Sequence, residues 1–115
     1  MQVNAHHIKC SEVHAAAYLD EPVELIELLK QGADQNCRDE FRQTPLITAT
    51  KAASMSVVEL LLGLDVSINS RDEIGETALT KARRKMIFFD VKGGENYYEL
   101  YKKMIDLLIK SGAEE

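Results

Sequence analysis

The sequence predicts an all-α helical solenoid, in which about three helix-turn-helix units stack into one domain over residues 1–115. Three observations lead to this fold class. Residues recur at a constant offset of 33 positions, capping residues precede the expected first helices, and leucines share one stripe of the expected second helix. A single unit cannot bury its apolar face alone, so neighbouring units are expected to share a continuous core.

The 33-residue period aligns two segments without a gap. Residues 39–49, DEFRQTPLITA, match residues 72–82, DEIGETALTKA, at Asp, Thr, Leu and Ala. The same offset backwards leads to residues 11–16, SEVHAA, where Ser replaces Thr and Val replaces Leu. A second block also repeats, with Leu25, Leu28, Leu29 and Asn36 matched by Val58, Leu61, Leu62 and Asn69. The units therefore span about residues 6–38, 39–71 and 72–115.

The expected first helix of each unit begins after a hydroxyl side chain. Thr44 precedes Pro45, which suits the first helical position because its missing N–H costs nothing there. Thr77 and Ser11 occupy the corresponding positions and predict the same kind of cap. Small residues, Ala16, Ala49 and Ala82, follow at the point where close packing of one helix on the next requires them.

These residues resemble the ankyrin repeat, whose signature at this period is Thr-Pro-Leu-His-x-Ala. Residues 44–49, TPLITA, carry the signature with Ile47 in the place of His, and His14 occupies that place in the first unit. Residues 28–36 look like the family's second helix and closing loop, and the resemblance covers about residues 6–115. It implies that the His14 imidazole bonds the backbone near the repeat turn, and that the chain acts by binding another protein.

The third unit departs from the pattern because it is too long. Thr44 and Asp65 are 21 positions apart, whereas the corresponding Thr77 and Gly112 are 35 positions apart, which leaves 14 extra residues. At 3.6 residues per turn, these equal about four turns, or two in each helix. Gly93-Gly94 is the natural break between the helices.

The extra residues predict a protruding helical hairpin. One helix is expected from Lys81 to about Val91 and the other from a capping Asn96 to about Lys110, with a long flexible loop over 84–101 as the alternative. Five of the seven aromatic residues fall in this segment: Phe88, Phe89, Tyr97, Tyr98 and Tyr101. They either join the two helices or form an exposed second docking surface, for which Phe88, Phe89, Tyr97 and Tyr98 are the candidates.

Composition and charge exclude several classes of function. Nineteen acidic residues against 14 Lys and Arg give a net charge of −5, so nucleic acid is not an expected partner. No apolar run approaches the roughly 20 residues of a membrane helix, and residues 1–7 lack the features of a signal peptide. Two cysteines are too few for a disulfide scaffold, so we expect a cytoplasmic protein with reduced, unreactive thiols.

The sequence offers little for catalysis or for metal and cofactor binding. His6, His7 and His14 lack the Cys or carboxylate spacing of a zinc site, and Cys10 and Cys37 lack an orienting third group for nucleophilic catalysis. We therefore expect no catalytic residue, no metal and no cofactor, and the chain is not expected to be an enzyme.

What remains is a surface for another protein. The resemblance implies that turn tips and the exposed edge of the first helices form a concave surface that contacts partners. Carried over by position, the partner-binding residues are Tyr18, Glu40, Phe41, Gln43, Lys51, Glu73, Ile74, Glu76 and Arg84. The glutamates predict a partner with a basic patch.

Phe41 and Ile74 stand out, because an apolar residue at a turn tip is not needed for the core and therefore indicates contact. Arg42 replaces the turn glycine of the family, so it must adopt a left-handed conformation or change the turn.

The expected function is that of a monomeric adaptor or stoichiometric inhibitor. Two alternatives remain open. The aromatic hairpin could pair with its copy in a symmetric dimer. Tyr97, Tyr98 and Tyr101 could instead line a pocket for a small molecule.

Overall fold

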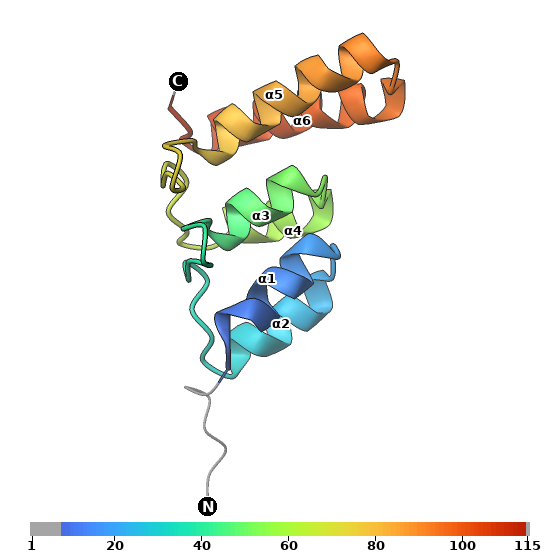
Figure 1. The fold of residues 1–115 in the computed structure, drawn as a ribbon. Helices are drawn as coiled ribbons and strands as arrows, with labels where there is room; N and C mark the ends of the chain where they lie inside the picture. Colours follow the sequence, from blue (N-terminus) through green and yellow to red (C-terminus); the bar gives the residue numbers. More distant parts are fainter. Residues whose placement is uncertain (1–7, 115) are drawn as a thin grey trace, which may run out of the picture.

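The computed structural model describes residues 8–114, which form three antiparallel helix pairs stacked in one direction (Figure 1). The helices are α1 (Cys10–Tyr18), α2 (Pro22–Lys30), α3 (Pro45–Lys51), α4 (Met55–Leu62), α5 (Ala78–Lys92) and α6 (Glu95–Lys110). No strand occurs within this described range, which confirms the predicted all-α repeat fold. Within the same range, no helix combines the length and apolarity that crossing a bilayer requires.

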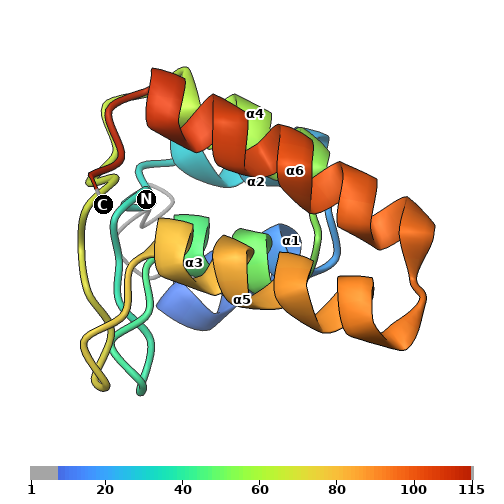
Figure 2. The same cartoon turned by 90° about the horizontal axis from the view of Figure 1, so that it is seen from above.

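The helices form two layers. Helices α1, α3 and α5 pack in one layer, and α2, α4 and α6 pack behind them in the other (Figure 2). The segments that enter α3 and α5, residues 39–43 and 72–76, lie at one end of the helices and project sideways past the first layer (Figure 2). We call these segments the turn tips. We call the surface formed by the turn tips and the adjoining side of the first layer the concave face.

The core follows the 33-residue period. Ala16, Ala49 and Ala82 are all fully buried, and their small side chains allow α1, α3 and α5 to approach one another. In the second layer, Leu25 and Leu28 are buried, as are their counterparts one unit later, Val58 and Leu61. The buried side of each helix thus follows from the i, i+3, i+4 spacing of its apolar residues.

Two of the three predicted caps are present. The hydroxyl oxygens of Thr44 and Thr77 accept hydrogen bonds from the backbone N–H of Ile47 and Thr80, each at 3.2 Å. The Ser11 cap is wrong, because α1 already begins at Cys10 and Lys9 stands at its N-cap without a side-chain bond. The first unit therefore starts without the side-chain cap that fixes the start of the other two.

The third unit contains the predicted helical hairpin and no long loop. Helices α5 and α6 have 15 and 16 residues, against seven and eight in α3 and α4, so they extend beyond the rest of the stack (Figure 2). The predicted Asn96 cap is wrong, since α6 begins at Glu95 after Gly94. A Cβ on Gly94 would lie 2.6 Å from the Phe89 ring, so this position must remain glycine while that ring stays in place.

Aromatic rings hold the lengthened hairpin together. The Phe89 ring stacks on Tyr97 and Tyr101, with centroids 4.8 and 6.2 Å apart. Tyr101 is only 1% exposed, and its hydroxyl donates to the carbonyl oxygens of Thr50 and Lys51 at 2.7 and 3.2 Å. One side chain of α6 thereby satisfies backbone acceptors at the C-terminal end of α3.

The cysteines do not occur as two free thiols. Cys10, at the start of α1, and Cys37, in the loop before the first turn tip, are joined by a disulfide. This corrects the expectation of reduced thiols, which rested only on there being two cysteines. The bond closes the first unit, whose start lacks a cap, across 27 positions of sequence.

Replacing Tyr101 with phenylalanine should lower the free energy of unfolding by about 1–2 kcal/mol, because two buried carbonyls lose a donor. Burial also raises the pKa of the Tyr101 hydroxyl to about 12. Folding therefore favours its protonated form, and the stability this provides is complete below the ordinary pKa near 10 and is lost as the pH rises towards 12.

Urea denaturation measures the first effect, with Tyr98→Phe, at a partly exposed position, as the matched control. Spectrophotometric titration of the folded protein measures the second. We expect one tyrosine to ionise later than the others and Tyr101→Phe to remove that late step. Loss of the late step in Tyr98→Phe would contradict this assignment.

Candidate functional site

The concave face contains three connected hollows. The hollow between units 1 and 2 has a volume of about 380 Å³, the one beside the first tip about 220 Å³, and the one beside α5 about 360 Å³. Lys51 lines all three, and so joins them into one groove. Four large apolar side chains remain exposed along this groove: Tyr18, Phe41, Ile74 and Phe88, at 63%, 49%, 67% and 51%.

Each turn tip is held by an aspartate at its base. One carboxylate oxygen of Asp39 accepts from the backbone N–H of Phe41 and Gln43 at 3.0 and 2.8 Å. Asp72 does the same for Ile74 and Glu76 at 3.1 and 2.9 Å. This bond pattern bends the chain so that the residue two positions after each aspartate, Phe41 or Ile74, points into solvent.

The two tips differ in backbone strain. Arg42 has a φ of +61°, in the left-handed region, which is the first of the two outcomes expected from its place in the repeat. Gly75 occupies the corresponding position one unit later with a φ of +83°. The left-handed turn is thus present at both tips. The first tip achieves it with Arg42, which has a Cβ, and the second tip with a glycine.

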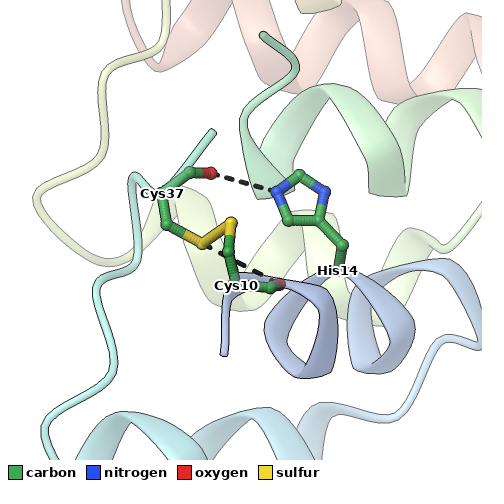
Figure 3. Close-up of side chains that lie close together, drawn as sticks. All are labelled: Cys10, His14 and Cys37. Atoms are coloured by element: carbon green, nitrogen blue, oxygen red, sulfur yellow. Dashed lines mark hydrogen bonds between the residues drawn. A yellow bond between two sulfur atoms is a disulfide. The ribbon is translucent and has the colours of Figure 1, made fainter. Parts of the chain in front are cut away.

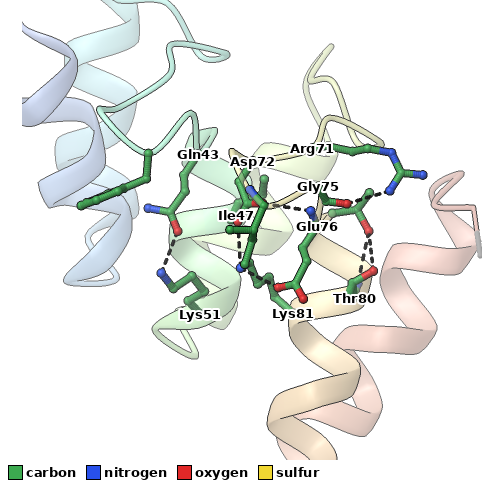
Figure 4. Close-up of polar contacts among 12 residues, drawn as sticks. Gln43, Ile47, Lys51, Arg71, Asp72, Gly75, Glu76, Thr80 and Lys81 are labelled. Atoms are coloured by element: carbon green, nitrogen blue, oxygen red, sulfur yellow. Dashed lines mark hydrogen bonds and ion pairs between the residues drawn. The ribbon is translucent and has the colours of Figure 1, made fainter.

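A buried ion network lies at the base of the second tip (Figure 4). The ammonium of Lys81 contacts Asp72 and Glu76, each at 2.8 Å, and the guanidinium of Arg84 contacts the second oxygen of Glu76 at 2.6 Å. The Asp72 side chain is only 4% exposed and those of Glu76 and Lys81 about one-tenth. Two carboxylates can be buried here only because two cations accompany them.

The network fixes the charge state of its members. Burial alone would raise the pKa of Asp72 and lower that of Lys81. The hydrogen bonds and charges that they share with each other outweigh burial, so the pKa of Asp72 lies below its usual value and that of Lys81 above. Both groups stay ionised at neutral pH, which suits them to binding and positioning and not to proton transfer.

The first tip has the same arrangement with fewer charged side chains. Gln43 replaces Glu76 and donates from its amide nitrogen to Asp39 at 2.8 Å, while its amide oxygen accepts from the ammonium of Lys51 at 2.7 Å (Figure 4). Thr48 stands in the place of Lys81. The charge of Lys51 is therefore not neutralised by Gln43, and it remains on the concave face.

His14 links the first unit to the second, as the family resemblance implies. Its Nε2 lies 3.0 Å from the carbonyl oxygen of Cys37, which can only accept, so Nε2 carries the proton. Nδ1 lies 2.6 Å from the Thr48 hydroxyl oxygen, within hydrogen-bond distance. The imidazole is 7% exposed and serves as a structural bridge.

Among residues 8–114, Cys10, His14 and Cys37 are also the nearest approach to a metal site (Figure 3). Their candidate ligand atoms all lie within 4.8 Å of one another. In this structure the two sulfurs are bonded to each other and both imidazole nitrogens have hydrogen-bond partners. These donors are therefore already engaged, and three of them fall short of the four ligands of a structural zinc site. His6 and His7 lie outside the described residues.

Most of the residues assigned to the concave face from sequence do lie there. Gln43 and Glu76 line the groove but are only 7% and 9% exposed, because their polar atoms hold the bases of the tips. Phe88, a candidate for the second surface, lines the groove together with Ile74.

The other hairpin aromatics divide between interior and surface. Phe89 and Tyr101 fill the space between α5 and α6, while Tyr97 remains 49% exposed. Tyr98 lies below the ammonium of Lys102, 5.8 Å from its ring centroid. The rings of Tyr97 and Tyr101 stack on Phe89, whereas Tyr98 lines a hollow together with Phe89 and Gly93.

Comparison with known proteins gives one family. A family model described as ankyrin repeats, in three copies, matches residues 13–114. The chain is 35% identical to Inversin of Danio rerio over 75 residues, which cover 65% of this chain and 7% of that protein. It is 36% identical to the Neurogenic locus Notch protein of Drosophila melanogaster over 89 residues, which cover 75% of this chain and 3% of that protein. The chain thus spans less than a tenth of the length of either relative.

Arg42→Gly should raise the free energy of unfolding by roughly 0.5–1 kcal/mol. A left-handed backbone costs an L-residue about 1–2 kcal/mol, and glycine offsets part of the gain because it loses more conformational entropy on folding. Gly75→Ala should lower it by about 1 kcal/mol. A Cβ on Gly75 meets no atom within 4 Å, so this loss reports backbone strain alone. Urea denaturation followed by circular dichroism measures both changes, and equal stability of all three proteins would contradict the strain.

Lys81→Thr should destabilise the protein by about 3 kcal/mol, because it leaves Asp72 and Glu76 buried without their shared cation. Adding Glu76→Gln reproduces the arrangement of the first tip and should recover most of the loss.

The pH dependence of the unfolding free energy follows from the lowered pKa of Asp72. The stability it contributes is present above the ordinary carboxyl pKa near 4 and is lost as the pH falls through its own lower value. The difference in unfolding free energy between the natural chain and Lys81→Thr should accordingly shrink below about pH 4. A difference that stays constant down to pH 2 would show that the ion network is not its source.

Proposed function

The chain belongs to the ankyrin-repeat family, and we propose from this that it is a non-catalytic module that binds another protein through its concave face, as an adaptor or a stoichiometric inhibitor. Ankyrin repeats generally mediate interactions between proteins. The relatives contain the same repeats within far longer chains, so the biological role of those proteins is not carried over.

One observation supports the choice of the concave face. Tyr18, Phe41, Ile74 and Phe88 are exposed large apolar side chains that lie along a single groove. None of the tip residues among them is required by the turn, whose geometry depends on Asp39 and Asp72. Aromatic and aliphatic side chains presented on a rigid scaffold are the typical anchors of a protein interface.

The charges divide the proposed surface into two parts. Glu40 and Glu73 are exposed on the tips and would attract the basic patch expected of the partner. Glu76 is already paired with Lys81 and Arg84, so it adds no free negative charge. We therefore assign the basic patch of the partner to the tips alone.

The two alternative functions have less support. Phe89 and Tyr101 are used inside the hairpin, which leaves less aromatic surface for a symmetric dimer, so we propose a monomer. The rings of Tyr97 and Tyr101 stack on Phe89, which weakens the case for a small-molecule pocket shared by Tyr97, Tyr98 and Tyr101. The cytoplasmic location remains a proposal with a consequence: in that reducing compartment the Cys10–Cys37 bond would be open.

Capture of partners from lysate of the source cells tests this proposal. A protein retained by the natural chain should be lost, or bound at least about tenfold more weakly, by Phe41→Ala/Ile74→Ala, because two exposed anchors are removed. Val23→Ala/Ile109→Ala is the matched control, since it removes exposed apolar side chains from α2 and α6, in the other layer.

Circular dichroism must first show that each variant is folded. Retention of the partner by the Phe41/Ile74 variant and its loss from the control would contradict a concave-face site. Titration calorimetry of the identified partner then gives the stoichiometry.

A further inference from the structure

The hollow beside α5 is the part of the groove that has no counterpart in the other units. Its lining consists of Lys51, Ile74, Glu76, Lys81, Arg84, Lys85 and Phe88. Four of these residues, at positions 81, 84, 85 and 88, recur at the i, i+3, i+4, i+7 spacing of one face of α5. In unit 2, α3 ends at Lys51, four residues short of the extent that Phe88 has on α5, so the first helix of that unit has no counterpart of Phe88. The lengthened α5 therefore creates this hollow.

The floor of the hollow is apolar. Ile74, at the tip, and Phe88, on α5, face it from two sides and are 67% and 51% exposed. Phe88 is held from behind by the edge-on Phe89 ring, with centroids 5.1 Å apart. A volume of about 360 Å³ is within the range of small binding pockets in proteins, roughly 300–1,000 Å³. The floor can thus receive one large apolar side chain.

The rim of the hollow carries an excess of positive charge. Lys51, Lys81, Arg84 and Lys85 line it, against one lining carboxylate, Glu76, and the buried Asp72 behind Lys81. Lys81 is compensated by those two carboxylates. Arg84 uses one nitrogen on Glu76 but its side chain is 71% exposed, so further guanidinium N–H groups face solvent. Among the described residues, neither Lys51 nor Lys85 forms an ion pair with an acidic side chain.

From this juxtaposition we infer that the hollow between Ile74 and Phe88 binds a segment of the partner protein in which one large apolar side chain stands within two residues of an Asp or Glu. The apolar side chain covers Ile74 and Phe88, and the carboxylate meets Lys85, Arg84 and Lys51. Seating the apolar group excludes water from the rim and strengthens the ion pairs beside it. The inference rests on the proposed concave-face function and specifies the chemistry of one part of it.

This division of charge also orients the bound segment. Glu40 and Glu73 at the tips repel a carboxylate, whereas the α5 side of the groove attracts one. A segment with a single acidic end therefore has a preferred direction along the groove.

Selection from a phage-displayed library of random dodecapeptides on the natural chain tests the inference, with Phe88→Ala used for counter-selection. The enriched peptides should share a large apolar residue with Asp or Glu within two positions. In fluorescence anisotropy, a labelled enriched peptide should bind Phe88→Ala and Ile74→Ala at least about tenfold more weakly. Lys85→Gln should weaken binding about threefold at low salt, and this difference should shrink at high salt.

Matched controls lie on the same helix. Val91→Ala and Lys92→Gln alter exposed residues of α5 that do not line the hollow, and binding should stay within about twofold of the natural chain. Replacing the acid of the peptide with its amide should weaken binding at least as much as Lys85→Gln does, because the carboxylate meets Arg84 and Lys51 as well. Lys85→Gln removes only a charge, so it tests the site even if Phe88→Ala perturbs the hairpin.

Several results would overturn the inference: no enrichment, enriched peptides without an acid, or equal binding to Phe88→Ala. A dimer that Phe88→Ala converts to a monomer in light scattering would assign the hollow to a second copy. If the captured partner is lost with Phe41→Ala/Ile74→Ala but unaffected by Phe88→Ala and Lys85→Gln, this inference fails and the proposed function stands. If none of these substitutions affects the partner, both fail.

Discussion

The stacking of helix pairs is the constraint on which every other feature depends. No pair has enough apolar surface to fold alone, so each buries its face against the next, with Ala16, Ala49 and Ala82 permitting the close approach. Once the first-layer helices are parallel and evenly spaced, the segments that enter them must also fall in line. The concave face is therefore a geometric by-product of the core, and residues upon it are free to vary with the partner.

The tips show how this freedom is used. Asp39 and Asp72 hold the same turn in both units, but one unit surrounds its aspartate with Gln43 and Lys51 and the other with Glu76, Lys81 and Arg84. The backbone is nearly the same, whereas the charge presented to a partner differs. A conserved scaffold geometry thus coexists with a surface whose electrostatic character changes from one unit to the next.

Local sequence patterns predicted the fold, the hairpin and the left-handed Arg42, because each follows from spacing along the chain. Features that depend on three-dimensional neighbours were missed. The burial of Gln43 and Glu76 requires knowing that Asp39 and Asp72 curl back to meet them. The disulfide joins residues 27 positions apart, and no local pattern brings them together. Neither the sequence pattern nor the structure identifies the partner, since its identity depends on another chain.

The inserted residues keep the apolar face of α6 directed at the stack. Val57, Val58 and Leu61 are buried in α4, and Met104, Ile105 and Leu108 occupy the corresponding places in α6. Half of the insertion, seven residues, is only about 20° short of two complete turns of helix, so the apolar face returns to the stack almost unrotated. The reach of the hairpin beyond the stack can therefore change by lengths close to a whole number of helical turns, while other lengths would turn the buried face towards water. Selection for a longer or shorter reach would act in such steps.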